Sequence, residues 1–237
     1  ASNSTVAGDD ARWISASAKI MVNVPPGRVN AKRRAAIARA YQWLNVEWTT
    51  TKNITKTDSY TKDSVTVLAG TRVHGLLYET EKGVPKYTID ATLPKKLDFT
   101  QLTPDQKSSG AYGAECVQLV YDAWYHGDPL MGGRDEDWFL ISHAATVSQI
   151  GWTEIQPGDA FGRSDHIALI VAVDNNGTPD YPNDDKYTII HQTLDHFGNA
   201  AYKYNGTVGV GTVWEVWTYN EATTRNFVPY KYGALDQ

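Results

Sequence analysis

The sequence predicts an α+β domain in which helices come first and antiparallel strands follow. Apolar residues recur at helical spacing around residues 30–46 and 116–125, whereas the chain after Trp152 carries short β-rich runs. Helices and strands that are segregated along a chain are typical of α+β folds. Because 41% of the residues are hydrophobic, the chain can form a substantial core, and we expect helices packed on an antiparallel sheet.

The first predicted helix extends from about Asn30 to Val46. The helix-breaking sequence Pro25-Pro26-Gly27 precedes it, and Asn30 is a suitable N-cap. The basic cluster Lys32-Arg33-Arg34 falls near its start, on a side that we expect to be solvated. The apolar stripe of this helix consists of Ile37, Ala40, Tyr41 and Leu44.

The segments on either side of the second helix have weaker patterns. Residues 49–67 are polar and rich in Thr, which indicates irregular loop and short strand. Residues 68–110 are rich in Gly, Pro and Lys and show no long periodicity, so we expect an extended excursion that wraps the domain. Trp138 to Gln149 predicts a further short helix.

Three strands are predicted in the C-terminal part of the chain. Residues 167–173 form an apolar run with little charge, which is typical of a buried strand. The turn signal Asn175-Asn176-Gly177 follows it. Residues 186–193 and 212–218 are the second and third strands.

Composition excludes several classes of protein. The net charge is −5 and the 22 basic residues are scattered along the chain, which argues against a nucleic-acid partner. There is no apolar run of about 18 residues, so no transmembrane segment is predicted. The single cysteine rules out an intramolecular disulfide and leaves a free thiol.

That cysteine, Cys116, follows a Gly-containing turn and begins the second predicted helix, which ends near Tyr125 before Gly127 and Pro129. A thiol in the first turn of a helix faces the positive end of the helix dipole, which favours the nucleophilic thiolate. A lone cysteine is more often a small buried apolar residue, so its interpretation as a nucleophile depends on finding a base. One face of the helix carries Cys116, Val120, Ala123 and Trp124.

Two histidines downstream supply the groups that a cysteine nucleophile needs. His166 opens an apolar strand after the turn Pro157-Gly158-Asp159, and His191 lies in the next strand. Adjacent antiparallel strands can place such side chains together, so we predict His166 as the base and His191 as the residue that orients it. His196 competes for the role of His191 but lies in a predicted turn.

The remaining histidines are predicted to be structural or exposed, namely His74, His126 and His143. The sequence contains no His-Glu-x-x-His motif and no phosphate-binding Gly-rich loop, and the cysteine is unaccompanied. Neither a metal nor a cofactor is therefore expected.

Five short motifs, taken together, resemble the NlpC-type cell-wall peptidases, which are compact papain-like cysteine hydrolases. They cover roughly residues 70–195 and occur in the order that is found in that family. The five are the Gly-x-x-Tyr element that ends at Tyr78, the nucleophile motif 115–120, the Pro-Gly-Asp turn within 155–161, the base-bearing strand 165–170 and the strand 189–193 with the third polar residue.

The resemblance implies a papain-like α+β fold in which N-terminal helices pack on an antiparallel β-sheet. Residues 69–237 would form the catalytic domain, and residues 1–68 would be a lead-in, helix and accessory segment. One continuous domain is the alternative. The chain begins with small polar residues and without an initiator Met. An exported bacterial protein, secreted or in the cell envelope, with its signal peptide removed, is implied, and a monomer is expected.

The resemblance also implies a reaction. Cys116 would attack an amide carbonyl after passing its proton to His166, while His191 orients His166, and a thioester would form and be hydrolysed. The backbone N–H of Cys116 and the hydroxyl of Tyr78 would stabilise the oxyanion. The implied substrate is a peptidoglycan stem peptide, cut between D-glutamate and a diamino acid.

Three positions depart from the family pattern. Val117 and Gln118 stand where the family usually has a small residue and Gly. Glu115 replaces the commoner Asp, which in some members helps to bind the free amine of the substrate. These changes concern the substrate more than the catalytic pair. The related CHAP amidases usually carry an acidic third residue, so His191 favours the NlpC type.

Two alternative functions stay open. The first is a non-catalytic cell-wall binding module on the same scaffold, in which Trp214 and Trp217 would stack on sugars, although residues at alternate strand positions more often pack in a core. The second is a cysteine amidase or acyltransferase with a substrate other than peptidoglycan.

Overall fold

The computed structural model describes residues 29–58, 61–78, 104, 115–127 and 147–237. The chain is an α+β protein in which most neighbouring strands are antiparallel, as the sequence predicts. The lead-in before residue 29 and most of the predicted excursion at 68–110 lie outside the described residues.

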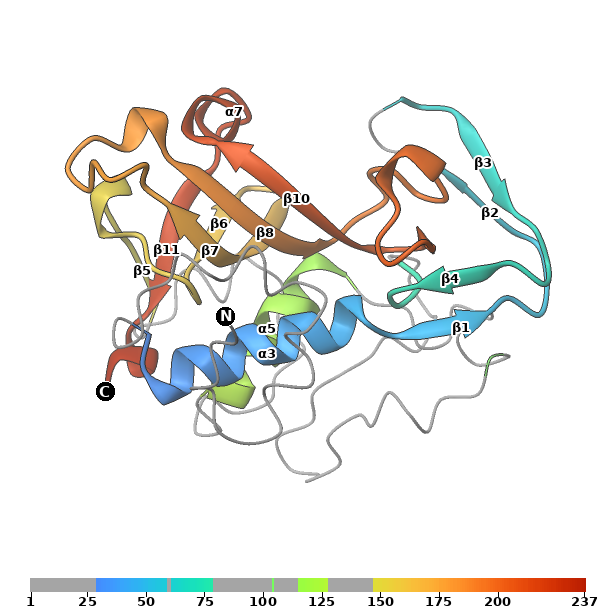
Figure 1. Cartoon of the computed structure of the whole chain (residues 1–237), viewed down its shortest axis with the longest axis horizontal. Helices are drawn as coiled ribbons and strands as arrows, with labels where there is room; N and C mark the ends of the chain where they lie inside the picture. The colour runs from blue at the N-terminus through green and yellow to red at the C-terminus, as the bar shows by residue number, and fades with distance from the viewer. Residues whose placement is uncertain (1–28, 59–60, 79–103, 105–114, 128–146) are drawn as a thin grey trace, which may run out of the picture.

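The largest sheet has six strands in the order β10-β8-β7-β6-β11-β5, and all of its pairs are antiparallel (Figure 1). The three predicted strands are its β7, β8 and β10. The six strands are β5 (Val147–Gln149), β6 (Ala160–Arg163), β7 (His166–Asp174), β8 (Lys186–Gln192), β10 (Thr212–Thr218) and β11 (Val228–Tyr232).

Two helices, α3 (Ala31–Leu44) and α5 (Cys116–Gly127), pack against each other and on one face of this sheet (Figure 1). Both were predicted close to these limits. The side chain of Asn30 caps α3 by accepting from the Arg33 N–H at 2.9 Å. Among the described residues, no helix combines the length and the apolar character needed to cross a membrane.

The sheet has a core on each face, because successive side chains of β7 point to opposite sides. Ile167 and Leu169 belong to the core that includes the two helices. Ala168 and Ile170 belong to a second core on the other face, together with the aromatic ring of Phe227. The short helix α7 (Tyr219–Thr224) contributes Ala222 to this second core.

Two smaller sheets contain the segment that the sequence predicts as loop and short strand. The first joins β1 (Glu47–Thr49), β4 (Arg72–His74) and β9 (Val208–Gly209), and β2 (Ile54–Thr57) pairs with β3 (Ser64–Val67) in the second. Regular pairing is therefore more extensive than the polar composition suggested. Among the residues that the structure describes there are also short 3₁₀ helices at Trp152–Glu154, Pro182–Asp184, Ala200–Tyr202 and Gly233–Asp236.

The end of the helix predicted at Trp138 to Gln149 is wrong, because Val147–Gln149 forms the edge strand β5. This strand pairs with β11, so that Tyr230 lies opposite Gln149. Its partner is far away in the sequence, and pairing of this kind overrides local helical preference. The remainder of the predicted helix lies outside the described residues.

The solvated position predicted for the basic cluster is wrong for Arg33, which is only 1% exposed. Its Nη1 donates to Asp159 Oδ1 at 2.8 Å, and its Nε donates to Asp236 Oδ1 at 2.7 Å. Helical periodicity could not reveal these partners, because they come from distant turns of the chain. A charged side chain can be buried at this place because carboxylates compensate it.

The Pro-Gly-Asp turn lies between the buried Arg33 side chain and the sheet, and it contacts both. Gly158 has a φ of +99°, and a Cβ at this position would lie 3.3 Å from the Arg33 side chain. The Gly158 N–H donates to Ile170 O at 2.8 Å, and the Gly158 carbonyl accepts from Trp124 Nε1 at 2.8 Å. The turn therefore connects α3, α5 and β7.

We expect Arg33→Met to lower the free energy of unfolding by about 3–5 kcal/mol, because the change leaves the Asp159 carboxylate buried without its partner. Urea unfolding followed by circular dichroism measures this loss. Arg34→Met is the matched control, since Arg34 is exposed, and we expect a change within about 0.5 kcal/mol. Equal effects of the two substitutions would contradict this account.

Candidate active site

Cys116 is the first residue of α5 and is 8% exposed. The backbone N–H of Glu115 donates to Gln118 Oε1 at 2.7 Å, so the Gln118 side chain caps the start of the helix. This contact gives a structural role to one of the residues that depart from the NlpC-type pattern.

Burial raises the pKa of the Cys116 thiol to about 11. The backbone N–H of Ile167 favours the thiolate, the charge of Glu115 disfavours it, and the N–H groups of Val117 and Cys116 favour it. The cost of removing the charge from water outweighs these favourable contacts. The sequence predicts a thiolate stabilised by the helix dipole. In the structure the thiol is neutral instead, because the sulfur is buried.

Tyr78 lies near this cysteine because its segment of the chain packs closely against the segment 210–212. Its N–H donates to Val210 O at 3.1 Å. Gly75 has a φ of +79°, and a Cβ there would lie 2.8 Å from Thr212 Cβ. The spacing in the Gly-x-x-Tyr element thus has a geometric reason, since only glycine allows this close approach.

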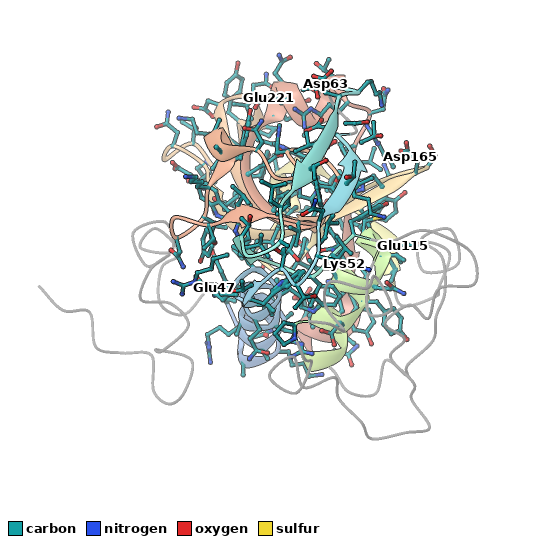
Figure 2. The ribbon with its side chains drawn as sticks, turned by 90° about the vertical axis from the view of Figure 1, so that its right-hand side faces the viewer. Glu47, Lys52, Asp63, Glu115, Asp165 and Glu221 are labelled. Carbon is teal, nitrogen blue, oxygen red and sulfur yellow. The ribbon has the colours of Figure 1, made fainter. Side chains whose placement is uncertain are left out.

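Acidic residues give the surroundings of Tyr78 a negative charge. Burial raises the pKa of its phenol, and Cys116, Glu115, Asp195 and Asp165 raise it further through their charges. Figure 2 shows Glu115 and Asp165 on the same side of the molecule. The Tyr78 hydroxyl consequently keeps its proton at neutral pH and can donate a hydrogen bond.

His166 and His191 are in direct contact, since His166 Nε2 lies 2.7 Å from His191 Nδ1. His191 is fully buried. Burial lowers the pKa of His166 well below its ordinary value, and the neighbouring His191 and Arg163 act in the same direction. The imidazole of His166 is thus neutral at neutral pH, and its Nε2 is engaged by His191.

The side chains of Cys116 and His166 lie on different faces of the sheet, near the start of β7. The sulfur lies near the N–H of Ile167, in the core on the helix side. The His166 ring is 6.0 Å from the Phe227 ring, measured between centroids, and Phe227 belongs to the core on the other face. Within the part of the chain that the structure describes, no hydrogen bond joins the Cys116 sulfur to the His166 ring.

Glu215 of β10 also belongs to this cluster, although the sequence analysis did not identify it. Its Oε1 lies 3.8 Å from His191 Nε2 and 3.1 Å from His196 Nε2, and its Oε2 accepts a hydrogen bond from Trp217 Nε1. Burial opposes ionisation, but His191, His196 and Trp217 hold the pKa of Glu215 far below its usual range. The sequence did contain a signal for Glu215, because it is the only charged residue in the strand β10.

His196 contacts the same carboxylate from the loop after β8. It has a φ of +62°, and its ring stacks on Tyr202 with centroids 3.5 Å apart. Burial lowers the pKa of His196, but the hydrogen bond to Glu215 outweighs this effect and raises the pKa above its ordinary value. The two candidates for the third residue therefore differ in position: His191 contacts His166, whereas His196 contacts Glu215.

The other histidines lie away from this cluster or outside the described part. His74 is buried, and its Nδ1 lies 3.0 Å from the hydroxyl of Thr207. The side chain of His126 and the whole of His143 are outside the described residues. Among the residues that the structure places, no three His, Cys, Asp or Glu side chains are grouped to hold a metal ion.

Comparison of the chain with protein-family models, with curated proteins and with solved structures gives no match in any of the three. The fold and the site by themselves define an α+β protein with a buried His-His-Glu cluster and a neutral cysteine close to one end of it.

We expect Cys116 to react slowly with iodoacetamide at neutral pH, and the rate to rise with pH toward the thiol pKa of about 11. Only the thiolate reacts, and a pKa of about 11 leaves roughly one thiol in 10⁴ ionised at neutral pH. Mass spectrometry gives an unambiguous rate, because the chain has one cysteine. Rapid labelling at about pH 5 would instead show a thiolate paired with an imidazolium.

Proposed function

We propose that the protein is a cysteine peptidase or amidase that hydrolyses amide bonds of peptidoglycan stem peptides. The observation that carries this proposal is the 2.7 Å contact between His166 and His191 at the start of β7, beside the residue whose N–H faces the Cys116 sulfur. A thiol, a neutral imidazole and a group that orients it are the components of nucleophilic catalysis by cysteine.

The proposal includes a papain-like fold of the NlpC type. Two features of the architecture support it: the nucleophile candidate starts helix α5, and this helix packs on the sheet whose adjacent strands β7 and β8 carry His166 and His191. The Pro-Gly-Asp turn leads into β6 and lies beside the middle of β7, because it hydrogen bonds to Ile170.

The reaction begins with a substrate carbonyl at the sulfur. The Cys116 thiol gives its proton to Nδ1 of His166, and the sulfur forms a bond to the carbonyl carbon. The Cys116 N–H and the Tyr78 hydroxyl stabilise the oxyanion. The C–N bond then breaks, the amine leaves with the proton from His166, and a thioester remains. Water, deprotonated by His166, hydrolyses the thioester and restores the thiol.

The proton transfer requires a change from the arrangement in this structure. Both groups are neutral, and no hydrogen bond joins them. The ring of His166 must therefore turn toward the sulfur, or a water molecule must carry the proton between them. Such an enzyme would form its ion pair only when substrate is present.

The carboxylates around Tyr78 support a substrate that carries a positive charge. Glu115, Asp165 and Asp195 all act on the Tyr78 phenol through their charges. An ammonium group near the scissile bond would be attracted to these carboxylates. Stem peptides contain a diamino acid and therefore supply such a group.

The second candidate function is a non-catalytic cell-wall binding module, and one observation favours it. The thiol is neutral, buried and not bonded to His166, as expected for a cysteine that only packs in a core. In this case the wild-type protein would bind peptidoglycan without releasing peptides, and Cys116→Ala would bind equally well.

We expect Cys116→Ala and His166→Ala each to reduce peptide release from purified peptidoglycan by about 10³-fold or more, because each removes a reacting group. Chromatography of the soluble products measures the release. Lys52→Ala, an exposed change in another sheet region, serves as the control and should keep full activity. Undiminished release by Cys116→Ala would end the proposal.

A further inference from the structure

We infer that Glu215 is a positioning residue that fixes the direction of the hydrogen bond between His191 and His166, so that His166 Nδ1 is left as a base. The catalytic meaning of this inference rests on the proposed function. The hydrogen-bond direction itself follows from the contacts of three buried or nearly buried side chains and can be measured independently.

The first observation concerns His191 Nε2. This atom is buried and has no hydrogen-bond partner among the described residues, and the Glu215 Oε1 atom faces it at 3.8 Å. A carboxylate has only lone pairs to present, so it attracts an N–H group and repels a lone pair. In a buried setting this preference is strong, because water does not screen it. His191 therefore carries its proton on Nε2.

The second step concerns the uncharged form of His191, because a neutral imidazole donates from one ring nitrogen and accepts at the other. With its proton on Nε2, His191 can only accept at Nδ1. His166 Nε2, which lies 2.7 Å away, must then be the donor. The proton of neutral His166 is thus on Nε2, and Nδ1 of His166 presents a lone pair.

The register of the sheet explains how Glu215 reaches this position. Val213 of β10 lies directly opposite His191 of β8. Glu215 is two residues further along β10 and therefore on the same face of the sheet, diagonal to His191. His196, Arg225 and Trp217 also face the carboxylate, with His196 Nε2 at 3.1 Å and Arg225 Nη1 at 3.9 Å.

Glu215→Gln gives a sharp test because Trp217 Nε1 can only donate. The amide oxygen of the new side chain must stay on Trp217, which turns its NH₂ group toward His191 Nε2. This NH₂ group favours a lone pair on His191 Nε2, as it does on the nearer His196 Nε2, and so reverses the chain: His191 Nδ1 would donate to His166 Nε2, and His166 Nδ1 would carry a proton.

The experiment is nitrogen NMR of the imidazole rings in the uniformly labelled full chain, which distinguishes protonated from unprotonated ring nitrogens. We expect unprotonated Nδ1 on His166 in the wild type and in Glu215→Asp, and protonated Nδ1 in Glu215→Gln. Glu47→Gln removes one carboxylate from the three-stranded sheet and should leave the pattern of the wild type. On purified peptidoglycan, Glu215→Gln should lose about 10³-fold or more in activity, and Glu215→Asp should retain most of it.

Three results would overturn the inference: a wild-type His166 that already carries its proton on Nδ1, a Glu215→Gln spectrum with the wild-type pattern, or a fully active Glu215→Gln where Cys116→Ala is inactive. The first needs no variant and so does not depend on how well a variant folds. If the spectra agree with the inference but Cys116→Ala still releases peptides, the proposed function fails and the role of Glu215 in the histidine pair stands. If Cys116→Ala is inactive and Glu215→Gln is fully active, only the inference fails.

Discussion

The buried ion pair between Arg33 and Asp159 is the interaction on which the arrangement of the site depends. The two residues are 126 positions apart in the sequence, and their contact attaches α3 to the turn in front of β6. The same turn accepts a hydrogen bond from Trp124 of α5 and donates one to Ile170 of β7. The helix that begins with Cys116 and the strand that begins with His166 are thus held by one turn.

In the site, burial keeps a thiol and an imidazole neutral, and negatively charged carboxylates lie around them. The thiol of Cys116 and the imidazole of His166 are both uncharged, since neither has enough compensation to be ionised away from water. Negative charge lies on Glu215 behind the histidine pair and on the carboxylates around Tyr78. In this arrangement a proton can pass from the sulfur to the His166 ring only if the ring turns toward the sulfur or a water molecule carries the proton between them.

Gln118 and Glu115, which differ from the NlpC-type pattern that the sequence resembles, have different physical effects in this structure. Gln118 uses its side chain to cap α5 at Glu115, so it contributes to the helix that begins with Cys116. Glu115 has its carboxylate near Tyr78 and raises the pKa of that phenol through its charge. One change therefore concerns local structure, and the other concerns the electrostatics that a substrate would meet.

The sequence by itself determined the elements whose signals are local. The periodicity of α3 and α5, the apolar run of β7 and the order of Cys116, His166 and His191 could all be read from neighbouring residues. The neighbouring position of β7 and β8 also followed, because the two strands are consecutive in the sequence and a turn signal follows the first of them.

Only the tertiary structure decided the features that depend on distant partners. Val147–Gln149 is a strand because β11 pairs with it, and Arg33 is buried because Asp159 and Asp236 compensate its charge. Glu215 reaches His191 because of the register between β8 and β10, and the thiol is neutral because the fold buries the sulfur. Long-range pairing, burial and charge compensation are set by three-dimensional proximity, which local sequence patterns do not encode.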